Sequence, residues 1–150
     1  TAKVISPQAR HPLLWKIWFD WQLPRVLKKL RVDVLYSPEG YCSLKTTVPT
    51  LMVLHDLAYL HFPNAFRKRD FRYLNKFTPQ FLAKAKHIIT VSNTVKRDIL
   101  QHFGADSRFP IITPSTITVA GNAINLIDRK FDNPTIEGSY ILYLGSIHPP

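Results

Sequence analysis

The stretch TLMVLHD, residues 50–56, indicates the fold of this chain. Its first five residues form a short, largely apolar run, and a histidine and an aspartate follow directly. A run of this length that ends in polar residues is typical of a buried strand leading into a loop. The same pattern recurs at VDVLY (32–36), HIITV (87–91), ITVA (117–120) and YILYL (140–144). The sequence therefore predicts five short strands.

Helical patterns separate these strands. Residues 13–30 have apolar positions three and four apart, and Pro24 is expected to break this segment into two helices. Residues 57–65 are expected to form an irregular loop, residues 66–85 a helix kinked at Pro79, and residues 93–103 a second helix. Ser92 and Gly104 suit the two ends of that last helix. Strands alternating with helices predict an α/β fold, with a Rossmann-like parallel sheet covered on both faces.

Composition excludes several protein classes. The 150 residues are 45% hydrophobic and 20% charged, which rules out disorder of the whole chain. A single cysteine, Cys42, excludes a disulfide scaffold and a cysteine-rich zinc site. No apolar run is long enough for a membrane-spanning helix. The formal net charge of +10 favours anionic partners: a lipid surface, nucleic acid or a phosphorylated ligand.

The predicted strands each end in a polar or glycine-containing loop. These loops are residues 37–40, His55-Asp56, Ser92, Gly121-Asn122 and residues 145–148. In open α/β sheets, ligands bind at the carboxyl ends of the strands. We therefore expect these loops to meet at one edge of the sheet and to form a site together.

Five segments in series resemble retaining glycosyltransferases of the family-4 type, which have the two-domain GT-B fold. They are VDVLYSPEG (32–40), PTLMVLHDLAYLHFP (49–63), AKHIITVSNTVKRDILQHFG (85–104), ITVAGNAI (117–124) and SYILYLGSIHPP (139–150). The resemblance implies that residues 1–132 are part of the N-terminal, acceptor-binding domain. Residues 133–150 would then be the linker and first strand of the C-terminal, donor-binding domain. On this interpretation the chain is a fragment that does not turn over by itself.

The resemblance places His55 near the donor sugar and the reacting centre. An imidazole there can donate a hydrogen bond to a sugar hydroxyl or stabilise developing charge. The alternative is a histidine that bonds a backbone group at the end of its strand. Asp56 either binds acceptor hydroxyls or caps the following loop, and the cap is slightly favoured.

The other candidate residues are also weighed against structural roles. Glu39 and Gly40 lie either in an acceptor-facing loop or in a plain turn. Ser92 is mainly a helix cap, although that helix end would face the cleft between the domains. Gly145 and Ser146 would bring backbone amides close to the donor diphosphate.

The resemblance implies transfer of a sugar from a nucleotide-sugar donor to an acceptor hydroxyl, with retained anomeric configuration. The acceptor would be a saccharide or a lipid-linked saccharide, in the synthesis of cell-envelope polysaccharide or glycolipid. No cofactor or metal is expected, and no Asp-x-Asp motif occurs in the sequence. The expected location is cytoplasmic, including a peripheral position on the inner face of the cytoplasmic membrane.

Two basic clusters give an alternative to catalysis. One comprises Arg67, Lys68, Arg69, Arg72 and Lys76, with aromatic residues interleaved, and the other comprises Arg25, Lys28, Lys29 and Arg31. Such a mixture is typical of a helix that lies on an anionic membrane surface, but also of a solvated helix face whose aromatics belong to the core. Nucleic-acid binding fits the net charge, but no recognisable binding motif accompanies it.

Overall fold

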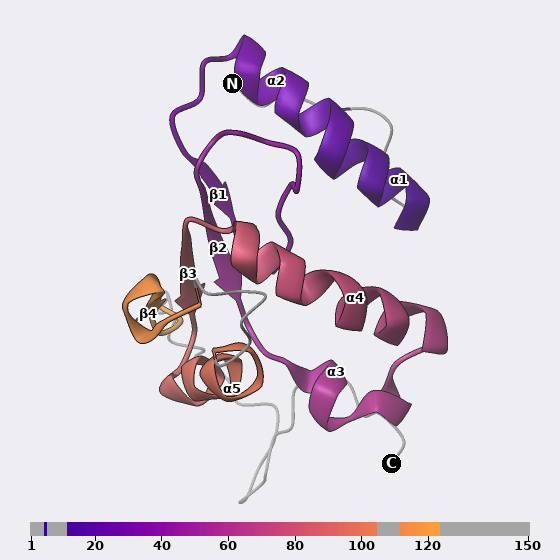
Figure 1. Cartoon of the computed structure of the whole chain (residues 1–150), viewed down its shortest axis with the longest axis vertical. Helices are drawn as coiled ribbons and strands as arrows, with labels where there is room; N and C mark the ends of the chain where they lie inside the picture. Colours follow the sequence, from indigo (N-terminus) through magenta and orange to yellow (C-terminus); the bar gives the residue numbers. More distant parts are fainter. Residues whose placement is uncertain (1–4, 6–11, 105–111, 124–150) are drawn as a thin grey trace, which may run out of the picture.

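The computed structural model describes residues 5, 12–104 and 112–123, and these contain a four-stranded parallel sheet in the order β1-β2-β3-β4 (Figure 1). The strands are β1 (Leu35–Ser37), β2 (Thr50–Leu54), β3 (His87–Thr90) and β4 (Ile117–Val119). Helix α4 (Lys68–Lys84) connects β2 to β3, and α5 (Asn93–Phe103) connects β3 to β4. The predicted α/β class and parallel sheet are confirmed. The fifth predicted strand, residues 140–144, lies outside the described residues.

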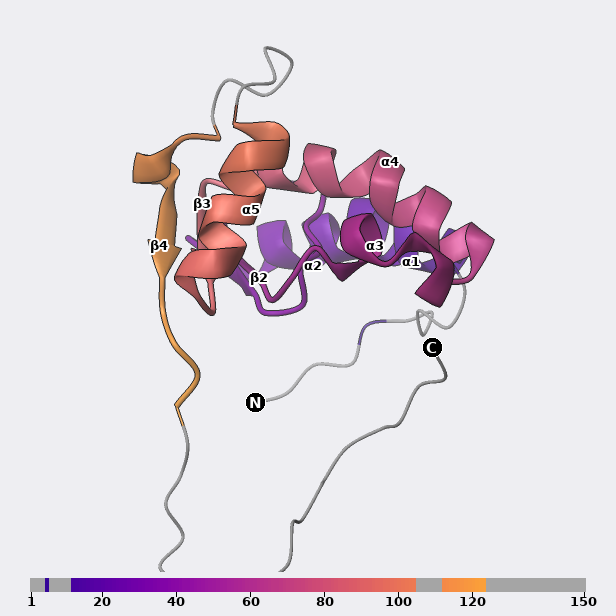
Figure 2. The ribbon, with the colours of Figure 1, turned by 90° about the horizontal axis from the view of Figure 1, so that it is seen from below.

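One face of the sheet forms the core. Met52, Ile88 and Ile117 are aligned across β2, β3 and β4, and all three are buried. Side chains of α4 and α5, including Leu82 and Ile99, pack in the same cluster. In the view of Figure 2, both helices lie on the same side of the strands.

The opposite face of the sheet is more open than the sequence predicts. Tyr36 and Thr118 are exposed there, and Leu51 and Ile89 are half-buried. Side chains alternate between the two faces along a strand, so these residues share the face opposite Met52. Val53 on this face is buried, so within the described residues the second face of the sheet is covered in part.

The first strand begins later than predicted. Residues 32–36 were expected to form it, but β1 spans Leu35–Ser37. The amide of Val32 donates to the carbonyl of Leu27, which ties Val32 to the end of the preceding helix. Arg31 has a φ of 52°, a left-handed conformation that turns the chain toward the sheet. Val32, the first residue of the predicted strand, is therefore bonded to the end of α2 and is not part of β1.

Pro24 does not divide the N-terminal helical segment. Helix α1 (Pro12–Ile17), a π-helical turn (Trp18–Gln22) and α2 (Leu23–Lys29) follow one another without a gap. Pro24 lies in the first turn of α2, where proline is tolerated because it lacks an amide hydrogen. The π-helical turn just before α2 has a wider hydrogen-bond spacing, so the helical segment continues although Pro24 donates no backbone hydrogen bond.

The segment predicted to be an irregular loop contains a short helix, α3 (Ala58–His61), and a 3-10 turn at Pro63–Ala65. Helix α4 then begins at Lys68 and continues through Pro79. Helix α5 begins as predicted, since the Ser92 hydroxyl accepts a hydrogen bond from the amide of Val95 at 3.3 Å. Gly104 is its C-cap residue.

Candidate functional site

A cavity of about 180 Å³ lies at the carboxyl ends of β1 and β2. Four residues predicted as site residues contribute to its wall: Glu39, Gly40, His55 and Asp56. The remaining lining residues are Tyr41, Leu54, Tyr59, Phe66, Leu74 and Thr78. The predicted convergence of the first two loops is therefore present, and we call this cavity the strand-end pocket.

His55 joins the two strand ends. Its Nε2 atom lies 2.9 Å from the carbonyl oxygen of Pro38, in the loop after β1. A carbonyl oxygen only accepts hydrogen bonds, so Nε2 carries the hydrogen and donates it. This is the backbone contact that the sequence left open as the alternative role of His55. It leaves Nδ1 of a neutral ring as a hydrogen-bond acceptor.

Asp56 caps the chain after β2. Its Oδ1 atom accepts a hydrogen bond of 2.9 Å from the amide of Ala58, the first residue of α3. A side chain bonded to the amide two residues on forms an Asx turn, which helps a helix to start. The carboxylate is exposed and its residue lines the strand-end pocket, so capping does not remove Asp56 from the site.

Gly40 supplies backbone geometry that other residues adopt poorly. Its φ is +71°, and a Cβ atom placed on it would lie 3.1 Å from Cδ1 of Leu54. The loop therefore needs a glycine both for its left-handed conformation and for its close approach to β2. Glu39, the residue before it, is exposed at the rim of the pocket.

The other predicted site residues that the structure describes are not in the wall of this pocket. Ser92 caps α5 and is not among the residues that line the strand-end pocket. Gly121 and Asn122 are exposed after β4. Gly145 and Ser146 lie outside the described residues.

Tyr59 and Thr78 line the pocket but were missed by sequence analysis. The hydroxyl of Tyr59 is buried and, within the part of the chain that the structure describes, has no partner in good hydrogen-bond geometry. Burial raises the pKa of Tyr59, and the nearby Thr78 side chain offsets part of that rise. A buried hydroxyl without a well-placed partner is costly, and a ligand hydroxyl could satisfy it. Local sequence carries no signal for this pair, because it forms only when α3 packs on α4.

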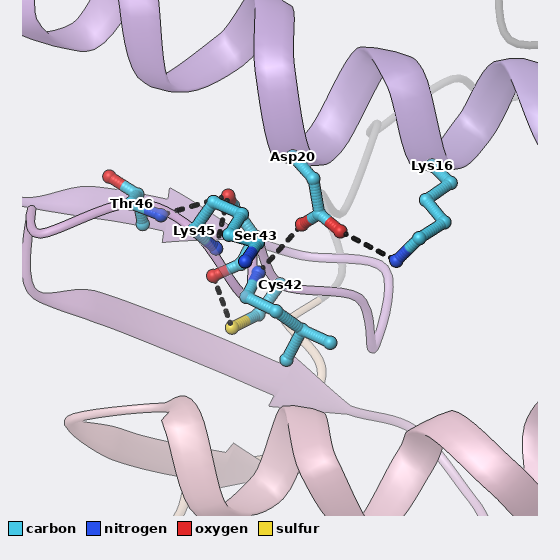
Figure 3. A network of polar contacts seen from close by, with 7 residues as sticks. Lys16, Asp20, Cys42, Ser43, Lys45 and Thr46 are labelled. Carbon is cyan, nitrogen blue, oxygen red and sulfur yellow. Dashed lines mark hydrogen bonds and ion pairs between the residues drawn. The ribbon is translucent and has the colours of Figure 1, made fainter.

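A buried aspartate in the π-helical turn, Asp20, bonds the loop that follows Gly40 (Figure 3). One carboxylate oxygen of Asp20 accepts from the amide of Leu44 at 2.9 Å, and the other accepts from Nζ of Lys16 at 3.1 Å. Within the same loop, Ser43 Oγ accepts from the amide of Thr46 at 3.1 Å. This polar network fixes the loop that follows Gly40.

A basic groove lies apart from the strand-end pocket, between α2 and the loop of residues 45–48. It has a volume of about 530 Å³, and its charged lining residues within the described chain are all cationic: Arg25, Lys28, Arg31 and Lys45. Trp21 is 57% exposed nearby, and the Arg25 guanidinium lies 5.7 Å from its ring centroid. We call this set of side chains the α2 basic groove.

The second basic cluster has a different environment. Arg67, Lys68 and Arg69 are exposed near the start of α4. The aromatic residues interleaved with this cluster, Phe71, Tyr73 and Phe77, pack against the hydrophobic core instead. This matches a solvated helix face whose aromatics belong to the core. No helix within the described ranges combines the length and apolar character needed to cross a bilayer.

Comparisons with known proteins found sequence relatives of this chain. The sequence profile of Glycosyltransferase Family 4 matches residues 2–126. The O-antigen chain mannosyltransferase RfbU of Salmonella typhimurium (strain LT2) is 30% identical over 143 residues. That alignment covers 92% of this chain and 36% of RfbU, so the chain spans about a third of the length of this relative. No solved structure shows a significant match to the chain.

Proposed function

The chain belongs to Glycosyltransferase Family 4, and from that premise we propose that it supplies the acceptor-binding side of a glycosyltransferase. In the proposed reaction, a hydroxyl oxygen of the acceptor replaces the nucleoside diphosphate at the anomeric carbon of the donor sugar, with retained configuration. The observation that carries the proposal is the strand-end pocket, where His55, Asp56, Glu39 and Gly40 meet. Carboxyl ends of parallel strands are where α/β folds bind ligands.

We propose a specific role for His55. With Nε2 donating to Pro38, the neutral ring presents Nδ1 as an acceptor for a sugar hydroxyl. As the acceptor oxygen bonds the anomeric carbon and the diphosphate leaves, Nδ1 would take the proton of that hydroxyl, and the resulting cation would stabilise the negative charge of the departing diphosphate. The hydrogen bond to Pro38 also limits rotation of the ring, which pre-orients it for either task.

Acceptor binding is proposed for Asp56, Glu39 and Tyr59. Oδ1 of Asp56 is engaged by the amide of Ala58, so Oδ2 is the atom assigned to an acceptor hydroxyl. The Tyr59 hydroxyl would gain the partner that it lacks within the described structure. Gly145 and Ser146 keep their proposed role at the donor diphosphate.

Mannose is the donor sugar that we propose first, since the similar Salmonella protein is an O-antigen chain mannosyltransferase. That similarity also supports a role in cell-envelope polysaccharide synthesis. The test uses the complete protein that carries this chain, radiolabelled nucleotide-activated mannose and saccharide-lipids extracted from membranes. Label should pass to the acceptor, and the coupling constant of the new anomeric proton should show retention.

The matched control in that assay is His87→Ala. His87 is the first residue of β3, so it lies at the opposite end of the strands from the strand-end pocket. Its Nε2 atom lies 2.8 Å from Oγ1 of Thr118. Transfer should survive this substitution and fall strongly in His55→Ala. Transfer with inverted configuration would refute the retaining mechanism, and equal losses in both variants would refute the role of His55.

We further propose that the α2 basic groove contacts an anionic membrane surface and keeps the protein at the inner face of the cytoplasmic membrane. Four cations line the groove, and the adjacent Trp21 is largely exposed. Each basic residue near an anionic leaflet contributes about 1 kcal/mol, and tryptophan favours the membrane interface.

The membrane proposal predicts co-sedimentation with vesicles that contain phosphatidylglycerol, weakened by salt, and not with phosphatidylcholine vesicles. Changing Arg25, Lys28 and Arg31 to alanine together should abolish it. The control removes three charges from the start of α4 and its N-cap instead, at Arg67, Lys68 and Arg69. Equal loss of vesicle binding in both triple variants would mean that net charge alone causes the binding. Tighter binding of the wild type to a DNA oligonucleotide than to these vesicles would favour a nucleic-acid partner.

A further inference from the structure

Three side chains of metal-ligating type meet between α3 and α5. His61 is the last residue of α3, whereas Asp98 and His102 are on α5. Nε2 of His61 lies 2.7 Å from Oδ2 of Asp98, and Nε2 of His102 lies 3.4 Å from Oδ1 of the same carboxylate. One ligating atom from each of the three residues falls within 4.8 Å of the others. No other such group occurs in the described part of the chain.

The sequence itself brings these ligands together. Asp98 and His102 are four residues apart, so the helix places them one above the other on the same face. His61, at the end of α3, joins them through its 2.7 Å contact with Asp98. The Asp98 side chain is only 17% exposed, whereas those of His61 and His102 are 47% and 36% exposed. The carboxylate is thus the inner member, with an imidazole on each of its oxygens.

We propose that His61, Asp98 and His102 bind a divalent transition-metal ion, with zinc as the best-fitting member of that class. Two imidazoles and one carboxylate are common zinc ligands, with bonds of about 2.0–2.2 Å. Neighbouring ligands of a tetrahedral zinc ion are therefore about 3.3 Å apart. The 2.7 and 3.4 Å separations run to different oxygens of Asp98, and the three ligating atoms lie within 4.8 Å of one another, so binding requires rotation of these side chains to bring both imidazoles and the carboxylate onto one ion.

The fourth coordination position would be open to water. A cavity of about 420 Å³ adjoins the cluster and is lined by His61, Asp98, Asp56 and Arg97, among others. Two carboxylates, Asp56 and Asp98, and one guanidinium, Arg97, line this cavity, so its formal charge is negative and favours a cation. Cys42 is buried and is not a ligand here.

The position of this site indicates a structural role. Helix α3 begins directly after Asp56 and Leu57, so an ion that joins His61 to α5 would fix the segment that follows His55. Glycosyl transfer itself needs no metal in the mechanism proposed above. The metal site rests on its own geometry and stands or falls independently of that mechanism.

Metal binding is tested directly on the wild-type chain, purified with EDTA and then dialysed. Isothermal titration with Zn²⁺ should give one site per chain. Substitution of Co²⁺ should give the visible absorption of a four-coordinate ion with nitrogen and oxygen ligands, without a thiolate band. Weak absorption typical of six-coordinate aqueous Co²⁺ would overturn the assignment, as would absence of Zn²⁺ binding.

Variants assign the ligands. His61→Ala, His102→Ala and Asp98→Asn should each weaken Zn²⁺ binding at least tenfold and abolish the Zn²⁺-dependent rise in Tm. Asp98→Asn preserves the shape of the side chain, so a loss of Zn²⁺ binding in this variant is not explained by misfolding. Circular dichroism in EDTA checks that all three variants are folded. His55→Ala and His87→Ala are the controls and should bind as the wild type does. Unchanged affinity in all three ligand variants would overturn the proposal.

Discussion

The Nε2 atom of His55 lies 2.9 Å from the carbonyl oxygen of Pro38, and this contact ties the end of β2 to the loop after β1. It restricts His55 to the tautomer in which Nε2 carries the hydrogen. The same bond holds the wall of the strand-end pocket, so the residue assigned to the reacting centre also shapes its surroundings.

Gly40→Ala should destabilise the fold by about 1–2 kcal/mol, because an alanine in the left-handed region is strained. The new methyl group would also lie 3.1 Å from Leu54 Cδ1. Urea unfolding measures the loss. Gly121→Ala is the control, since a Cβ atom there meets nothing within 4 Å. Equal stabilities of the two variants would contradict the argument for Gly40.

Tyr59→Phe should weaken acceptor binding without destabilising the fold. Removing a buried hydroxyl without a well-placed partner should leave the free energy of unfolding unchanged or raise it by up to about 1 kcal/mol. If that hydroxyl binds the acceptor, the KM for acceptor should rise severalfold. Thermal unfolding and acceptor-dependent kinetics measure the two effects. A marked loss of stability would mean that Thr78 already satisfies the hydroxyl.

Sequence patterns predicted the parts of this fold that depend on local order. Strands β2 and β3, the Ser92 cap and the meeting of His55 with Gly40 follow from apolar runs and their polar ends. The π-helical turn before Pro24, the late start of β1 and the Tyr59–Thr78 pair were not predictable in this way. The π-helical turn and the Tyr59–Thr78 pair depend on tertiary contacts, such as the Asp20 carboxylate bonded to the Leu44 amide, that no single window of sequence contains. The late start of β1 follows instead from the hydrogen bond between Val32 and Leu27 at the end of α2, which the apolar pattern does not reveal.

Ser92→Ala should cost about 1 kcal/mol of stability through loss of the helix cap. Sugar transfer should stay near the wild-type rate, since Ser92 does not line the strand-end pocket. Ser92→Asp should restore stability, because a carboxylate also accepts from the Val95 amide. Loss of transfer in the aspartate variant, with stability restored, would reveal a direct role for the hydroxyl.

Alkaline pH should destabilise the fold through Cys42. Burial raises the pKa of its thiol from 9.0 to about 12. Above pH 9 the unfolded state loses a proton that the folded state keeps, so the free energy of unfolding falls as pH rises toward 12. The decline for one such group is about 1 kcal/mol per pH unit. Below pH 9 both states are protonated and the contribution is constant.

Burial raises the pKa of Tyr73 to about 12 as well, so the wild type combines several declines above pH 9. The Cys42 contribution is isolated by comparison with Cys42→Ala, measured by urea unfolding at pH 8, 9 and 10. The wild type should lose stability more steeply than the variant above pH 9. Parallel pH profiles would contradict the raised thiol pKa.

The most direct test of the central claim compares His55→Ala with the wild type in the complete protein, using single-turnover sugar transfer and equilibrium donor binding. The account predicts a fall of about a hundredfold or more in the transfer rate, with donor affinity changed less than threefold. Unfolding in urea verifies that the variant folds. Equal losses in transfer rate and donor affinity would contradict the account and leave His55 as a residue that only holds Pro38 and its loop.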